Sequence, residues 1–217
     1  DQFKNHILPD KVHILNVSFL VPRMRREFGG CAGNIAYNLH LLGGKPIPMG
    51  TVGADFGPYR QHFEALGIDL SRVKVIEELF TPQAFITTDH DNNQITAFHP
   101  GAMARSHENH VKDVPGVSLG LVGPDGRDGM LQNAVEFGEM GVPFIFDPGQ
   151  AMPLFNGQEL RVFIDQADYV VVNDYESNLL QERTGWSDRE IVQRVKAYIV
   201  TQGPRGALVH TPGQSYE

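Results

Sequence analysis

The C-terminal half of the chain alternates short apolar runs with amphipathic segments. From about residue 117 the order is VSLGLV, LQNAVEFGEMG, PFIFDP, ELRVFIDQA, DYVVVN, a helical segment from residue 175, and YIVTQG. Runs that are apolar on both faces and that alternate with helical patterns are typical of parallel strands covered by helices on two sides. The pattern therefore predicts an α/β fold built around a parallel sheet.

Two segments of the first hundred residues lie outside this alternation and have the period of strands. Residues 11–20, KVHILNVSFL, alternate well enough to predict a strand with Leu15, Val17 and Phe19 on one face. Residues 83–98 form two alternating runs around Asp91-Asn92-Asn93, which is a hairpin signature. We expect both segments to form a small, mainly antiparallel flap over one edge of the α/β layer.

Three helices have recognisable start or stop residues, such as a capping side chain before the first turn or a glycine after the last. The predicted helices span 34–42, with Asn34 as cap and Gly43 as stop, from Pro58 to just before Gly67, and 188–196 after a capping box of Ser187 and Glu190.

A glycine-rich loop precedes the first of these helices. The sequence FGGCAGN, residues 28–34, places three glycines in five positions. Glycines let the backbone adopt positive φ, and they let another molecule approach the main chain without a Cβ in the way. The loop matches neither the G-x-G-x-x-G nor the G-x-x-x-x-G-K-[ST] fingerprint of nucleotide sites. It is either a tight structural turn or a cradle for a ligand.

Polar or flexible groups follow four of the predicted strands, where the ligand crevice of an open parallel sheet forms. These strand ends are GPDG at 123–126, DPG at 147–149, NDYE at 173–176 and TQGPRG at 201–206.

Asn173 and Glu176 are three residues apart at a strand-to-helix junction. An amide and a carboxylate there suit a hydrated Mg²⁺ ion, and the same spacing equally suits a helix cap with a glutamate in the first turn. Thr201 and Gly203 fit a phosphate contact or a plain hairpin turn. The residues alone leave both pairs of interpretations open.

Charge, apolar runs and cysteine content limit the kinds of molecule the protein could bind and the compartment in which we expect it. The formal net charge of −8 argues against nucleic acid or an anionic membrane surface as a partner. No apolar run is long enough to span a membrane. Cys31 is the single cysteine, which excludes an internal disulfide and fits a reducing compartment, so we expect a cytoplasmic location.

Taken in order, FGGCAGNIAYNLHLLGG, DNNQITAFHPGAM, NDYE and TQGPRG resemble the PfkB (ribokinase-like) kinases, most closely the bacterial adenosine kinase-like or sugar kinase branch. The resemblance covers nearly the whole chain. It implies one three-layer ribokinase-like domain over 1–217, with helices on both faces of a parallel sheet and a β-sheet lid from about 11–20 and 83–98. It also implies phosphoryl transfer from ATP to a hydroxymethyl group of a nucleoside or sugar.

The resemblance assigns roles to the residues of three motifs. Gly29, Gly30 and Asn34 would bind the ribose hydroxyls, Asn173 and Glu176 would organise the phosphates and Mg²⁺, with Glu176 acting through water, and Thr201 and Gly203 would lie near the nucleotide. Whether a monovalent cation activates the reaction, and whether the lid pairs with a second copy to make a homodimer, stays open.

Two elements of the family pattern are absent from these residues. The G-x-G-D motif, whose aspartate takes the proton from the acceptor hydroxyl, does not occur, so no catalytic base is assigned within the chain. The family's first strand would precede Asp1. We therefore expect the 217 residues to be part of a longer enzyme. The alternative is a non-catalytic module that binds a sugar or nucleotide.

Overall fold

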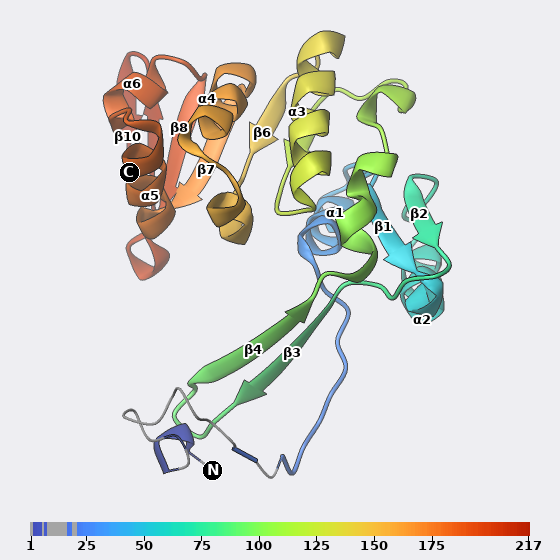
Figure 1. Ribbon diagram of the computed structural model, residues 1–217. Helices are drawn as coiled ribbons and strands as arrows, with labels where there is room; N and C mark the ends of the chain where they lie inside the picture. Colours follow the sequence, from blue (N-terminus) through green and yellow to red (C-terminus); the bar gives the residue numbers. More distant parts are fainter. Residues whose placement is uncertain (1, 6, 8–16, 19–20) are drawn as a thin grey trace.

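Residues 2–5, 7, 17–18 and 21–217 are described by a computed structural model, drawn as a ribbon in Figure 1. The helices are α1 (Cys31–Leu41), α2 (Gly57–Ala65), α3 (Arg127–Met140), α4 (Gly157–Gln166), α5 (Asp174–Thr184) and α6 (Asp188–Val192). The strands are β1 (Gly50–Gly53), β2 (Val73–Ile76), β3 (Gln83–Thr88), β4 (Gln94–His99), β5 (Gly120–Val122), β6 (Phe144–Phe146), β7 (Tyr169–Asn173), β8 (Ala197–Thr201), β9 (Ala207–Thr211) and β10 (Gln214–Tyr216).

The largest sheet has six strands in the order β10-β9-β8-β7-β6-β5. Strands β5 to β8 are parallel, as the alternation of apolar and amphipathic segments predicts. Strands β9 and β10 are antiparallel to their neighbours. The sheet is therefore mixed rather than wholly parallel, because the turn after β8 returns the chain directly as a hairpin. The predicted α/β fold class is confirmed.

The helices between the parallel strands cover one face of this sheet. Strands β5 to β8 are added in one direction, and right-handed crossovers in one direction place every connecting helix on the same side. On that side Phe146 of β6 stacks on Phe163 of α4, with ring centroids 4.4 Å apart. On the opposite face Ile145, Val171 and Ile199 are only half-buried. Helices were predicted on both faces of the sheet, and among the described residues the helices between the parallel strands form only one of these two layers.

Capping boxes begin the last three helices. In each one a side chain of the cap residue accepts from the N3 backbone N–H, and the N3 glutamate accepts from the cap N–H. The predicted helix over 188–196 was too long, because α6 ends at Val192. The chain must unwind there, since Ala197 already pairs with Tyr169 in the parallel sheet.

A second core lies under α1 and α2. It contains Ala36 of α1, Phe63 of α2 and the side chains of the short parallel pair β1 and β2, among them Val52. The predicted start of α2 is confirmed, with proline in the first turn and Gly67 in the left-handed region at φ 73° after the helix. The sequence pattern did not predict β1 or β2.

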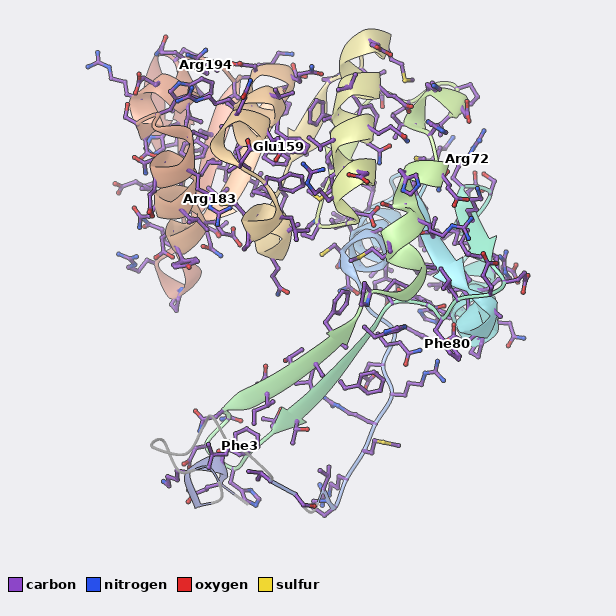
Figure 2. The ribbon with its side chains drawn as sticks, viewed as in Figure 1. Phe3, Arg72, Phe80, Glu159, Arg183 and Arg194 are labelled. Atoms are coloured by element: carbon purple, nitrogen blue, oxygen red, sulfur yellow. The ribbon has the colours of Figure 1, made fainter. Side chains whose placement is uncertain are left out.

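Strands β3 and β4 form the predicted hairpin, a separate two-stranded antiparallel sheet that extends away from the rest of the molecule (Figure 1). Figure 2 shows Phe80 at its base and Phe3 at its far end. At that end the carboxylate of Asp89 accepts from the backbone N–H groups of Phe3, Asp91 and Asn93. Burial opposes ionisation of Asp89, but these hydrogen bonds outweigh it and lower its pKa to about 2.

The second predicted lid strand, residues 11–20, lies outside the described residues except for 17–18, so it stays a prediction. Within the described part of the chain, no helix has the length and apolar character that crossing a membrane requires.

Candidate functional site

The glycine loop exposes bare backbone at the start of α1. Gly30 is the cap residue, with φ 89°, and it makes no side-chain cap hydrogen bond. A Cβ added at Gly29 or at Gly30 would meet no atom within 4 Å. These two glycines therefore border open space, which favours the cradle over the packed turn as the interpretation of this part of the loop.

The structure corrects the position of Asn34. Sequence spacing predicted it as the cap of a helix over 34–42, but the helix begins at Cys31 and the Asn34 N–H donates to the Gly30 carbonyl at 2.9 Å. Asn34 thus lies in the first helical turn and is exposed. The reason is that Gly30 ends the preceding segment through its positive φ, so no capping side chain is needed.

Asn173 and Glu176 form the capping box of α5 at the end of β7. The Glu176 N–H donates to Asn173 Oδ1 and the Asn173 N–H donates to Glu176 Oε2, both at 2.8 Å. Both side chains thus have a structural role without any metal. This hydrogen bond uses one carboxylate oxygen of Glu176, and the half-buried side chain stays at the carboxyl edge of the sheet.

Thr201 and Gly203 lie beside this box, at the end of the neighbouring strand. Thr201 pairs with Asn173 in the parallel register, and its hydroxyl donates to the Val172 carbonyl at 3.4 Å. Gly203 has φ 58° and open space around its Cα. The segment forms the hairpin turn between β8 and β9, and a contact with a nucleotide remains a prediction.

Asp147, at the end of β6, interacts electrostatically with groups at the start of α1 and in the capping box of α5. Burial, followed by the negative charge of Glu176, raises the pKa of Asp147. Burial, followed by the charge of Asp147, raises the pKa of the Cys31 thiol in α1. The Asp147 carboxylate therefore lies within electrostatic range of both the start of α1 and the capping box at the end of β7.

A further acid, Asp125, borders the loop that carries Asp147. It follows β5, its Oδ1 accepts from the Gly126 N–H at 2.8 Å, and burial raises its pKa to about 6. The two loops touch, since a Cβ on Gly149 would lie 2.7 Å from Pro124 Cγ. The sequence shows that both aspartates follow strands, but it does not show their burial.

The site residues fit a hydrated magnesium ion better than a fully protein-coordinated one. Among the described residues no group of three or more His, Cys, Asp or Glu side chains is placed to hold a metal. Mg²⁺ keeps several water ligands and takes one or two carboxylates in sites where phosphates supply the rest. The carboxylate of Glu176 is compatible with that role, and when bound the ion would neutralise phosphate charge.

Comparison with known proteins identifies the family. The family model for pfkB family carbohydrate kinases matches residues 7–217. The chain belongs to this family. The resemblance stated from the glycine loop, NDYE and TQGPRG is confirmed, and the chain is a member of a kinase family with the ribokinase-like fold.

The pfkB-family chain is similar to several nucleoside kinases. The structure of Burkholderia thailandensis nucleoside kinase in complex with inosine is 54% identical, with a TM-score of 0.89 over 94% of this chain and 68% of that one. A structure of the same enzyme in complex with ADP-inosine has a TM-score of 0.86, covering 100% of this chain and 68% of that one. The nucleoside kinase of Methanocaldococcus jannaschii is 29% identical over 93% of this chain and 67% of its own length. The chain thus spans about two thirds of the length of these relatives.

Proposed function

We propose that this protein transfers the terminal phosphoryl group of ATP to the hydroxymethyl group of a nucleoside. The observation that carries the proposal is the 54% identity to a nucleoside kinase whose structures contain inosine and ADP-inosine. At this identity the glycine loop and the strand ends are expected to serve the same class of substrate. The family resemblance alone left nucleoside and sugar open.

The open backbone of the glycine loop supports a role in holding the acceptor. The Gly29 and Gly30 carbonyls are already hydrogen-bonded, but a Cβ added at either position would meet nothing within 4 Å, so a ligand can approach the backbone there. Asn34 presents an exposed amide from the first turn of the same helix. Ribose hydroxyls donate and accept hydrogen bonds, so peptide and amide groups of this kind suit them. We assign Gly29, Gly30 and Asn34 to the nucleoside.

The capping box and the hairpin turn support a role in holding the donor. Phosphoryl transfer depends mainly on positioning and charge stabilisation. Glu176 would hold Mg²⁺ through water, Asn173 would fix Glu176 through their reciprocal hydrogen bonds, and Thr201 and Gly203 would border the nucleotide. Because ATP is the proposed donor, we place the reaction in the cytoplasm.

No residue of this chain is assigned as the base. The G-x-G-D motif does not occur in residues 1–217. We propose that these residues act as one ribokinase-like domain in the full-length protein, whose remaining sequence supplies the proton-accepting carboxylate. If the full-length protein lacks such a group, the absent motif favours the second candidate function, a module that binds a nucleoside without phosphorylating it.

We also propose that the hairpin pairs with a second copy to form a homodimer. Directly paired residues share a face, and side chains on a strand alternate between faces. Phe85 and Ile95, whose partners are Ala97 and Thr87, therefore lie on one face of the hairpin, and Ile86 and Phe98 lie on the other. All four side chains are more than 40% exposed. One apolar face can cover the substrate while the other packs against a partner. Sedimentation of Phe85→Lys and Ile86→Lys variants tests this, with one variant expected to be monomeric and a monomeric wild type contradicting it.

The activity is tested by an acceptor screen. The full-length protein is mixed with ATP and Mg²⁺, and ADP release is followed with inosine, adenosine, other nucleosides, ribose or fructose. We expect release that depends on at least one nucleoside. Activity with free sugars alone would replace the acceptor class, and nucleoside binding by calorimetry without ADP release would support the binding module.

A further inference from the structure

One side chain of α2 fixes the beginning of the glycine loop. The hydroxyl of Tyr59 donates to the Gly29 carbonyl at 3.0 Å. The ring of Phe28, the residue before Gly29, stacks on the Tyr59 ring with centroids 4.6 Å apart and planes 15° from parallel. Main chain and side chain at this point are therefore both attached to Tyr59, thirty positions away in the sequence.

Tyr59 is itself held by the second core. Its ring packs on Phe63 at a centroid distance of 4.7 Å and on Phe56 at 5.5 Å, and both phenylalanines are buried. Burial also raises the pKa of Tyr59, so its hydroxyl stays protonated and donates. The attachment of the loop thus rests on the buried second core.

The third glycine of the loop fits the same hydroxyl. A Cβ on Gly33 would lie 2.1 Å from Tyr59 Oη and 3.2 Å from Tyr59 Cζ, so the severe clash is with the hydroxyl oxygen, while the ring would need to move by only a few tenths of an ångström. Gly29 and Gly30 differ, because a Cβ there would meet nothing within 4 Å. The three glycines therefore divide into two that border open space and one that accommodates Tyr59.

We infer that Tyr59 is a positioning residue that holds the glycine loop in the shape that binds the nucleoside, and that Gly33 is required to admit its hydroxyl. This inference rests on the proposed function. Tyr59 acts through Gly29 rather than on the substrate itself, so its loss affects affinity for the acceptor and leaves the donor side, at the ends of β7 and β8, unchanged.

The first test uses Tyr59→Phe in the full-length protein, which removes only the hydroxyl. We expect the KM for inosine, or for the preferred nucleoside of the screen, to rise by about 3- to 10-fold, as for one lost hydrogen bond. We expect kcat to stay within about twofold, because the lost interaction holds the acceptor equally well in the ground state and in the transition state. The KM for ATP should also stay within about twofold, because Tyr59 does not touch the donor side. An unchanged nucleoside KM, or an equal rise in both KM values, overturns the inference.

The matched control is Tyr37→Phe. Tyr37 belongs to the same aromatic group, since its ring stacks on His62 at 6.3 Å, and no hydrogen bond of its hydroxyl is seen among the described residues. We expect this variant to keep the wild-type KM for the nucleoside. A rise equal to that of Tyr59→Phe would mean that any loss of a tyrosine hydroxyl near the loop has this effect, which overturns the inference.

A double-mutant cycle gives the second test. Gly33→Ala alone displaces the Tyr59 hydroxyl, so we expect its nucleoside KM to rise at least as much as that of Tyr59→Phe. In the double variant the clashing oxygen is absent, and the KM is expected to return to the value of Tyr59→Phe alone. Effects that multiply in the double variant overturn the inference, because the two residues would then act independently.

The experiments distinguish a failure of the proposed function from a failure of the role assigned to Tyr59. A wild-type protein that is inactive with every nucleoside refutes the function and the role of Tyr59 with it. An active wild type, with a Tyr59→Phe variant of equal nucleoside KM, refutes only the role of Tyr59.

Discussion

Asp125 provides a stability prediction that depends on burial at the candidate site. The carboxyl group follows β5, accepts one hydrogen bond from the Gly126 N–H, and has its pKa raised by burial to about 6. An aspartate in an unfolded chain has a pKa of about 4. The folded state therefore keeps a proton that the unfolded state has released between roughly pH 4 and pH 6.

The sign and size of the effect follow from this difference. Because the folded state binds more protons in that window, the free energy of unfolding falls as the pH rises through it and stays lower above pH 6. The folded and unfolded pKa values differ by about two units, and each unit corresponds to about 1.4 kcal/mol, so the ionisable side chain lowers the free energy of unfolding by about 3 kcal/mol at pH 8. At pH 4 only about half of the unfolded chains have lost the proton, and the loss is about 0.5 kcal/mol. Asp125→Asn cannot ionise and can still accept from Gly126, so the variant avoids this loss.

Urea denaturation at pH 4 and pH 8 measures the effect. We expect Asp125→Asn to be more stable than wild type by about 3 kcal/mol at pH 8 and by about 0.5 kcal/mol at pH 4. The control is Asp128→Asn, which removes the same charge from a side chain that is 71% exposed. Its effect should stay below about 0.5 kcal/mol. A gain that is the same at both pH values, or that the control reproduces, would refute the reasoning.

Two further predictions concern the proposed substrate groups. Asn34→Ala in the full-length protein should weaken nucleoside binding by about 1–3 kcal/mol without lowering stability, and an affinity unchanged by calorimetry would count against the contact. Glu176→Gln should lower turnover and raise the Mg²⁺ concentration needed, while the melting temperature stays nearly constant because glutamine also completes a capping box. The control is Glu190→Gln, which makes the same change in the capping box that begins α6 and should leave turnover unchanged. A large loss of stability with normal turnover in Glu176→Gln would leave Glu176 only its structural role.

Local signals predicted the elements whose causes lie within a few residues. The capping box at Ser187 and the turn in the β3–β4 hairpin were readable because their hydrogen bonds join residues three or four positions apart. At Asn173 the same spacing left a helix cap and a magnesium site open, and the structure shows the capping box. The start of α1 was misplaced because it depends on the backbone angle of Gly30, which no side chain announces. The end of α6 was misplaced because pairing of Ala197 with a distant strand decides it.

Other features depend on tertiary packing and leave no local trace. Strands β1 and β2 are only four residues long, and they are held by the second core rather than by an alternating pattern. The sequence also marked Asp125 and Asp147 as residues that follow strands, but their raised pKa values come from burial. The contact of Tyr59 with Gly29 and Gly33 joins segments from different elements.

The central claim is that a nucleoside hydroxymethyl group accepts the phosphoryl group of ATP, and phosphorus NMR of the reaction products tests it directly. The full-length protein is incubated with ATP, Mg²⁺ and inosine, and the spectrum is followed until ATP is consumed. We predict a phosphate monoester on the inosine 5′-oxygen that forms in equal amount with ADP. Inorganic phosphate formed at the same rate with and without inosine, or a monoester on another hydroxyl, would contradict the account.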